Sequence, residues 1–267
     1  MRGLIRDIWR YRGFVQGSIR REIVTQYRGS LLGAAWVLIG PMAMILIYTL
    51  VFSHLMRSRL VGVDSAFGYS IFLCAGLLPW TFFAESLTRL QAVFVTNGNL
   101  MKKAMFPRIC LPIVALGVAG FNFVVIVSLF LIFLVVSGSF PGLVLLAALP
   151  ALSVQIALAT GLGMLFATLN VFFRDVGQAV TLLLQFWFWL TPIVYPLASL
   201  PGWAQSVLVW NPLAVIVSHY QSVLLYQRLP DPTAWLGLSG VAGPALASLW
   251  LGLATYRRRF GEMVDEL

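Results

Sequence analysis

Long uncharged stretches constrain the fold of this chain more than any other feature. Between Leu31 and Met56 there is no Asp, Glu, Lys or Arg, and about 20 mainly apolar residues are enough for a helix to cross a bilayer core. Similar stretches recur along the chain. Of its 267 residues 60% are hydrophobic and 10% are charged, whereas a soluble domain carries about 25% charge. The sequence therefore predicts an all-α polytopic membrane protein.

We predict an N-terminal arm followed by six transmembrane helices. The arm, residues 1–32, combines arginines with apolar residues at helical spacing, which is typical of an amphipathic interface helix on the membrane surface. A tail that only fixes the topology is the alternative. Residues 33–267 form the transmembrane domain, with spans at about 33–56, 66–95, 109–136, 143–169, 176–196 and 234–256.

The basic residues orient these spans. Cytosolic loops of membrane proteins are enriched in Lys and Arg, and six spans leave only Arg57, Arg59 and Arg228 of the 18 basic residues outside. Both termini are then cytosolic. Lipid headgroups and orientation explain the net charge of +9, so membrane lipids are the expected partners and nucleic acid is not.

The segment 197–233 is predicted to dip into the outer leaflet and return as two re-entrant external helices. Residues 203–226 are apolar enough for a seventh span, but a central Asn-Pro pair disfavours a continuous helix, and a seventh crossing places Arg257–Arg259 outside. Irregular backbone in a membrane needs protein or a water-filled path around it. We interpret the segment as an external gate with candidate residues Pro196, Trp203, Trp210, Asn211 and Pro212.

The sequence holds no pattern that is typical of an enzyme or a metal site. Only Glu85 of the nine acidic residues falls within a predicted span, and His54 and His219 are far apart. There is no HExxH motif and no metal-spaced cysteine pair. The only lysines, Lys102 and Lys103, belong to no P-loop. We predict no catalytic residue, metal or cofactor in this chain; if it works in a process driven by ATP, another polypeptide must bind ATP and Mg²⁺.

Glu85 and Arg89 form a charged pair within the second predicted span. They are four residues apart on one helical face, in the order that favours an ion pair. Carriers driven by protons or sodium usually have several acidic residues in their spans, so one acid gives that function little support. A structural ion pair, or a contact between spans, and a role in substrate passage both stay open.

Five stretches, taken in order, resemble the ABC-2 type permeases that export polysaccharides. They are YRGSLLGAAWVLIGPMAMILIYTLVFS from Tyr27, AGLLPWTFFAESL from Ala75, NGNLMKKAMFPRICLP from Asn97, NVFFRDVGQ from Asn170 and WNPLAVIV from Trp210. The resemblance covers nearly the whole chain. It implies a homodimer of six-span subunits in a bacterial inner membrane, with two ABC ATPase subunits beneath it and a coupling helix after the second span.

The same resemblance implies which residues contact the ATPase. They lie on the arm, in the loop after the second span and in the turn before the fifth: Arg20, Arg21, Glu22, Tyr27, Arg28, Asn97, Leu100, Lys102, Lys103, Phe106, Arg108, Arg174 and Asp175. Topology anchoring is the alternative for the two lysines.

Aromatic residues indicate a path for sugars, whose apolar CH faces lie against aromatic rings while their hydroxyls stay hydrated. The candidates are Trp36, Tyr48, Phe52, Phe186, Trp187, Trp189 and Tyr195, together with Glu85 and Arg89. Neighbours on a helix point about 100° apart, so we expect at most two of the four aromatics 186–189 to face one lumen. Trp and Tyr are also common at membrane interfaces.

We predict a permease subunit that moves a lipid-linked polysaccharide outward across the inner membrane. O-antigen is the first candidate substrate. Capsular polysaccharide or teichoic acid is the alternative substrate, and drug or haem export is the alternative within the family. A membrane enzyme acting on lipid-linked sugars and an ion-coupled carrier are the alternatives from other classes.

Overall fold

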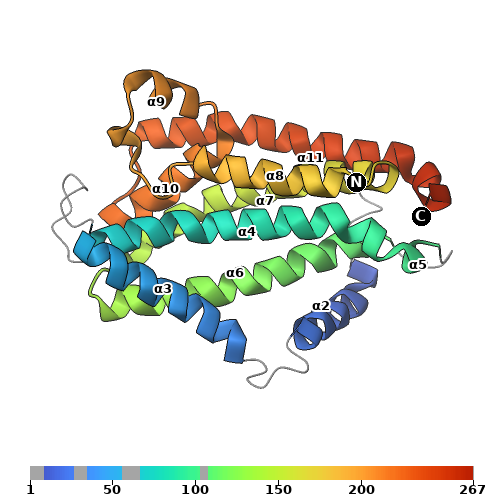
Figure 1. Cartoon of the computed structure of the whole chain (residues 1–267), viewed down its shortest axis with the longest axis horizontal. Coiled ribbons are helices and arrows are strands. Elements are labelled where there is room, and N and C mark those ends of the chain that lie inside the picture. Colours follow the sequence, from blue (N-terminus) through green and yellow to red (C-terminus); the bar gives the residue numbers. More distant parts are fainter. Residues whose placement is uncertain (1–8, 27–34, 56–66, 103–107, 267) are drawn as a thin grey trace.

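The computed structural model describes residues 9–26, 35–55, 67–102 and 108–266, and all regular structure in these ranges is helical. The elements follow one another as a bundle (Figure 1). In chain order they are α2 (Arg12–Gln26), α3 (Trp36–Leu55), α4 (Gly68–Thr96), α5 (Gly98–Met101), α6 (Cys110–Val136), the 3-10 helix η2 (Gly142–Ala147), α7 (Ala148–Phe172), α8 (Val176–Trp189), the 3-10 helix η3 (Leu197–Ser199), α9 (Gly202–Leu208), α10 (Pro212–Tyr226) and α11 (Pro232–Glu266).

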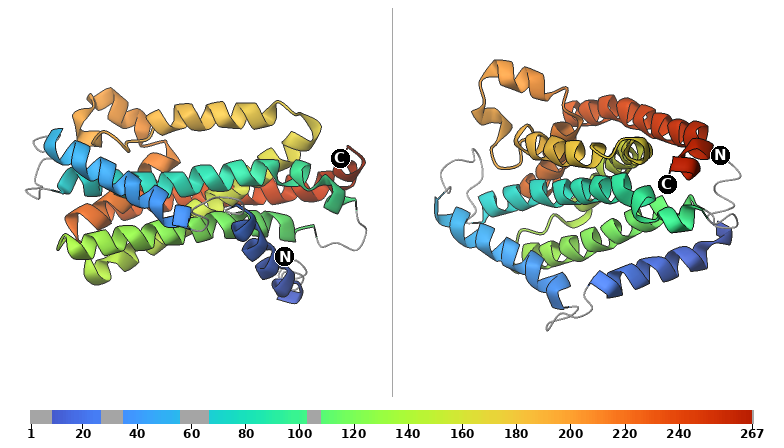
Figure 2. Two further views of the ribbon diagram at one scale, coloured as in Figure 1. Left: turned by 60° about the horizontal axis from the view of Figure 1, so that its bottom comes forward. Right: turned by 45° about the vertical axis from the view of Figure 1, so that its right-hand side comes forward.

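The bundle has two ends. The arm end holds α2, α5, the turn between α7 and α8, and the last residues of α11 (Figures 1 and 2). The opposite end holds η2, η3, α9 and the connection from α10 to α11. Long helices connect the two ends.

Four helical stretches are long and apolar enough to cross a membrane: Gly68–Thr96, Cys110–Val136, Gly142–Phe172 and Pro232–Glu266. They match the second, third, fourth and sixth predicted spans. α9 and α10 meet at an angle of 100° and make a fifth crossing if they are taken together. The chain is thus a multi-pass helical membrane protein with four to five candidate spans among its described residues, and the predicted break at Asn211-Pro212 is present.

The first and fifth predicted spans are shorter helices. α3 has 20 residues, and α8 has 14 and ends at Trp189, before the predicted boundary at 196. At 1.5 Å per residue α8 is about 21 Å long, less than the roughly 30 Å of a hydrocarbon core. Pro192 and Pro196 account for the early end, because proline lacks an N–H and restricts the residue before it.

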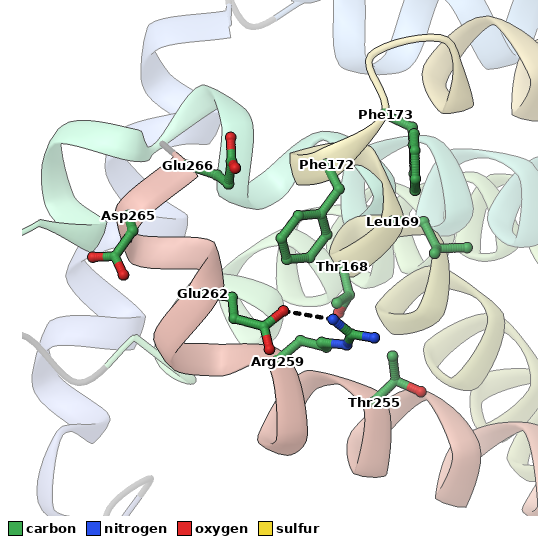
Figure 3. Close-up of a pocket in the computed structure, with 9 residues that line it drawn as sticks. All are labelled: Thr168, Leu169, Phe172, Phe173, Thr255, Arg259, Glu262, Asp265 and Glu266. Carbon is green, nitrogen blue, oxygen red and sulfur yellow. Dashed lines mark hydrogen bonds and ion pairs between the residues drawn. The ribbon is translucent and has the colours of Figure 1, made fainter.

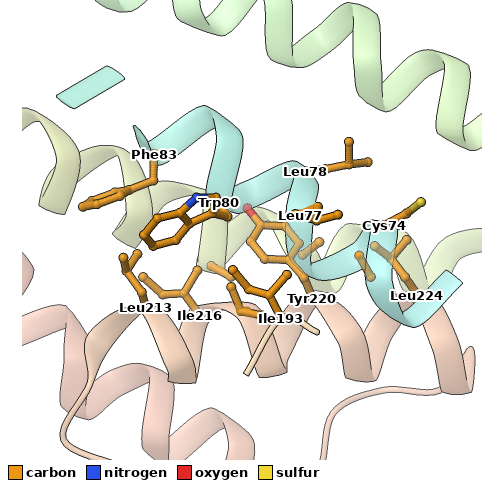
Figure 4. Close-up of a cluster of buried hydrophobic side chains, with 14 of the residues drawn as sticks. Cys74, Leu77, Leu78, Trp80, Phe83, Ile193, Leu213, Ile216, Tyr220 and Leu224 are labelled. Atoms are coloured by element: carbon orange, nitrogen blue, oxygen red, sulfur yellow. The ribbon is translucent and has the colours of Figure 1, made fainter. Parts of the chain in front are cut away.

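α4 is the centre of the bundle. Of the 18 residues in its most apolar stretch 78% are buried, whereas the corresponding share is 22 to 28% in the other candidate spans. Figure 4 shows its side chains packed against Ile193 and the α10 residues Leu213, Ile216 and Tyr220. Trp80 of α4 also packs edge to face on Phe188, with ring centroids 5.5 Å apart. Helices α6, α7 and α10 therefore surround α4 and turn their outer faces away from it.

α7 and α11 approach each other at a pair of glycines. A Cβ placed on Gly161 would overlap the backbone of α11 at Ser248 and Leu249, and a Cβ placed on Gly252 would overlap the Gly161 carbonyl. Apolar surface alone does not drive helices together in lipid, so small residues that allow close backbone packing stabilise such contacts. The two glycines therefore fix α11 against α7.

Candidate functional site

A groove at the arm end lies between α2 and the ends of α4, α5 and α6. Its volume is about 670 Å³. Apolar side chains such as Phe14, Leu100 and Val114 share its lining with the charged Arg21, Glu22 and Arg89. This mixture of apolar and charged walls distinguishes the groove from the outer face of α6, where the exposed side chains include Val124, Ile132 and Val135.

α2 is held against α6 by a small apolar contact. Val15 packs on Cys110 and Val114 near the start of α6, and Ile19 lies directly over Gly117, where a Cβ would overlap its side chain. The rest of α2 is mainly exposed. This narrow apolar face explains why the basic arm packs at this position.

Arg89 joins α2 to α4 through two carboxylates. Its Nη1 donates to Glu22 Oε1 at 2.9 Å, and its Nε donates to Glu85 Oε1 at 2.7 Å. Asn122 Nδ2 of α6 donates to the same Glu85 oxygen at 2.7 Å. The side chains of Arg89 and Glu85 are 24% and 29% exposed. Three elements therefore meet at one charged network.

The network reaches far into the bundle. Glu85 lies eleven residues before the end of α4 at Thr96, and Asn122 lies twelve residues after the start of α6 at Cys110. At 1.5 Å per residue these depths are about 17 and 18 Å. A charge at such depth in a membrane is costly unless it is paired or reaches water. The arrangement accordingly gives Glu85 a cation and an amide donor.

Several residues predicted to contact an ATPase lie at this groove. Arg21, Glu22, Asn97 and Leu100 line it. Asn97 Nδ2 also donates to the Val93 carbonyl at 2.9 Å, which satisfies an otherwise unpaired group in the last turn of α4.

Other predicted ATPase contacts lie elsewhere at the arm end or are outside the description. Arg20 and Lys102 are exposed, on α2 and after α5, and Arg174 and Asp175 form an exposed turn between α7 and α8. Tyr27, Arg28, Lys103 and Phe106 lie outside the described residues.

Arg108 contacts the C-terminal part of α11. Its guanidinium carbon lies 4.8 Å from the centroid of the Phe260 ring. Nearby, Tyr256 stacks on Phe94 of α4 with centroids 5.3 Å apart, and Met263 is fully buried. Arg108, the end of α4 and the end of α11 are therefore parts of one packed layer.

A second pocket at the arm end, of about 600 Å³, lies between α7 and α11 (Figure 3). Phe172 and Phe173 line its α7 side, and Asp265 lines its α11 side. Arg259 donates to Glu262 at 2.6 Å across one helical turn. The acidic residues of this pocket contrast with the basic residues of α2.

At the opposite end, residues 190–196 have no helical structure; residues 191–193 are buried, Ile193 fully, whereas Leu190 is exposed. Unpaired carbonyls are costly in an apolar interior. Side chains from other elements satisfy three of them: Asn211 Nδ2 donates to Leu190 O at 2.8 Å, Gln221 Nε2 to Pro192 O at 3.1 Å, and Tyr69 Oη to Val194 O at 2.6 Å. The segment is thus fixed by side chains.

Asn211 connects the end of α8 to the start of α10. Its Oδ1 accepts from Trp187 Nε1 at 2.9 Å and from the Leu213 amide at 3.0 Å, which caps α10. Pro212 follows as the first residue of α10, a position that suits proline. The other predicted gate residues, Pro196, Trp203 and Trp210, are partly or fully exposed around this junction.

Replacing Asn211 with alanine is expected to destabilise this junction. The change removes the cap and leaves the Trp187 indole N–H and the Leu190 carbonyl without a partner, at a combined cost of about 2 kcal/mol. For a chain of this size that lowers the unfolding midpoint in mild detergent by roughly 4–8 °C. Ser206→Ala on α9 removes only an exposed hydroxyl and serves as the matched control. Equal midpoints for the two variants would contradict the role of Asn211.

The aromatic candidates on α8 point in different directions. Phe186 and Trp189, three residues apart, are 69% and 66% exposed. Trp187 instead packs edge to face on Phe83 with centroids 5.4 Å apart. Tyr195 Oη donates to the Trp189 carbonyl at 2.7 Å. α8 therefore presents two of its aromatic candidates on its outer face.

Three further path candidates belong to α3. The helix α3 includes positions 36, 48 and 52, but the side chains of Trp36, Tyr48 and Phe52 lie outside the description. Their part in a substrate path stays a prediction.

Sequence reasoning missed the polar residues that connect helices. Asn122, Tyr69 and Gln221 each hold a group on another element. A signal was present for Asn122, because it is an isolated amide within an apolar helical stretch, and such residues often bond across helices in membranes.

Comparison with known proteins identifies a family whose sequences this chain matches. Residues 15–225 match the family described as ABC-2 type transporter. The chain is 28% identical to the O-antigen export system permease protein RfbA of Myxococcus xanthus over 99% of both chains. It is 30% identical to RfbA of Klebsiella pneumoniae over 77% of both chains. It is 24% identical to the polysialic acid transport protein KpsM of Escherichia coli over 92% of this chain and 93% of that protein.

Proposed function

Because the chain belongs to the ABC-2 type transporter family, we propose that it is the permease subunit of an ATP-driven exporter of lipid-linked polysaccharide. The end-to-end similarity to an O-antigen export permease carries this proposal and makes O-antigen the first candidate substrate. Capsular polysaccharide is the second candidate, since similarity to a polysialic acid transport protein also covers most of the chain. ATP hydrolysis is assigned to a separate subunit.

The proposed topology has six spans and cytosolic termini in the bacterial inner membrane. α3 is the first span, and α8 with residues 190–196 is the fifth; α9 and α10 form the re-entrant pair. The arm end then faces the cytosol, which agrees with the cluster of basic residues there. In this assignment residues 1–32 are the interface arm and residues 33–267 are the transmembrane domain.

The arm end is the proposed docking surface for two ATPase subunits under a homodimer. Arg20, Arg21, Lys102 and Arg174 supply basic groups on this surface, and α2 packs directly on α6. A movement of the ATPase against α2 or α5 would therefore be transmitted to α4 and α6. The exposed Phe186 and Trp189 of α8 are the described candidates for the glycan path.

Reconstitution in cells tests the proposal. A host that makes the lipid-linked glycan but lacks both its own export permease and its export ATPase is expected to display glycan at the cell surface when this chain and its ATPase are both supplied. Supplying the chain alone, or with an ATPase whose P-loop lysine is replaced, should leave surface glycan at background. ATP hydrolysis by the purified chain alone, or surface glycan without any ATPase, would overturn the assignment.

A further inference from the structure

Arg89 has N–H groups that make no hydrogen bond to the described residues. A guanidinium carries five N–H groups, and among the described residues Arg89 uses only Nε and Nη1, toward Glu85 and Glu22. Its Nη2 makes no hydrogen bond in this part of the chain. Arg89 also lines the 670 Å³ groove. A fork of donors that faces a groove is the arrangement with which arginine binds the paired oxygens of carboxylates and phosphates.

Glu22 stands where an anionic ligand would bind. One of its carboxylate oxygens accepts from Arg89 at 2.9 Å, yet the Glu22 side chain is 44% exposed on the arm and not part of the bundle interior. Arg21, Thr25 and Thr96 line the same groove. The Arg21 guanidinium and the Thr25 hydroxyl would add donors for further oxygens of a phosphate, whereas the Thr96 hydroxyl already donates to the Ala92 carbonyl.

The charges of the groove favour an anion only when Glu22 withdraws. The charged side chains that line the groove are Arg21, Glu22 and Arg89, and Glu85 forms an ion pair with Arg89. Their formal charges cancel while Glu22 is in place. Glu85 is held from the far side by Asn122, so the departure of Glu22 leaves one net positive charge at the groove.

We propose that this groove binds the phosphate group of the lipid-linked substrate and that Glu22 competes with that phosphate for Arg89. The inference rests on the proposed function, which places the groove at the cytosolic leaflet, where a lipid that carries a glycan through a phosphate linkage presents its headgroup. Substrate arrival and displacement of the arm are then one event, because the groove has a net positive charge to offer the phosphate only once Glu22 has left Arg89.

Lipid retention by the full-length chain tests the proposal. The chain is placed in phosphatidylcholine nanodiscs that contain a minor fraction of either a long-chain isoprenoid diphosphate or phosphatidic acid, and retained lipid is counted by native mass spectrometry. Glu22→Gln removes the competing charge while keeping the side-chain shape. Losing one charge-assisted competitor should raise retention of the diphosphate roughly tenfold.

Two further variants complete the design. Glu85→Gln combined with Arg89→Gln removes the guanidinium without leaving an unpaired carboxylate at position 85, and the Glu22 carboxylate that remains is 44% exposed. Retention should fall to background. Arg12→Gln is the matched control, because Arg12 lies on the same helix over the Trp9 ring and does not line the groove. Its retention should equal that of the unmodified chain.

Each outcome decides the proposal. Unchanged retention in Glu22→Gln, or full retention in the double variant, would overturn it. Equal retention of phosphatidic acid would assign the groove to bulk anionic lipid, and equal displacement by inorganic phosphate would assign it to a soluble anion; both would overturn the substrate assignment. If glycan export fails in cells while Glu22→Gln still retains more diphosphate, the proposed function is wrong and the phosphate site stands.

Discussion

Replacing Arg89 with leucine is expected to destabilise the folded chain by about 3 kcal/mol, because breaking a largely buried ion pair leaves a charge without its partner. Glu85 would retain only the Asn122 amide, about 17 Å from the end of its helix. The carboxylate must then draw water into the bundle to stay solvated. The midpoint of thermal unfolding in mild detergent should fall by roughly 6–12 °C.

Ranking three variants by their stability tests whether the loss comes from the unpaired charge. Glu85→Gln alone should be mild, because a glutamine oxygen still accepts from Asn122 and Arg89 keeps Glu22. Glu85→Gln combined with Arg89→Leu should recover much of the loss, since no unpaired carboxylate remains at that depth. If the double variant is as unstable as Arg89→Leu alone, the loss comes from packing of the arginine side chain and not from its charge.

The sequence predicted the long spans because their physical cause is local. A helix such as α6 or α7 satisfies its own backbone hydrogen bonds, so an uninterrupted apolar run is enough to specify it in a membrane. The end of α8 was placed seven residues late for the opposite reason. Residues 190–196 are apolar, and their non-helical backbone is stabilised by Tyr69 and Gln221, which are distant in sequence.

The candidate site shows the same division between local and distant information. The spacing of Glu85 and Arg89 predicted their pairing, because residues four apart face each other on one helix. Sequence spacing contains no signal that Glu22, 67 residues before Arg89, or Asn122, 37 residues after Glu85, completes the network. The pair therefore takes part in contacts between α2, α4 and α6, and its role in substrate passage stays a prediction.

Replacing Gly161 with alanine is expected to loosen the contact between α7 and α11. The added Cβ would overlap the α11 backbone at Ser248 and Leu249, and a backbone cannot move aside as the end of a long side chain does. Forced separation of packed elements costs about 1–3 kcal/mol and occasionally more, and the long shared contact of these helices favours the upper part of that range. The unfolding midpoint should fall by roughly 6 °C or more.

Another glycine of the same helix pair provides the control that isolates this effect. A Cβ added to Gly243 of α11 would meet no atom within 4 Å, so Gly243→Ala should be neutral or stabilising by about 0.5–1 kcal/mol through helix propensity. Gly252→Ala should resemble Gly161→Ala, because its Cβ would overlap the Gly161 carbonyl. Once the first alanine has separated the helices, the second adds little, so the double variant should lose less than the two single losses together. Additive losses would show that the two glycines act at independent contacts and would contradict a single point of closest approach.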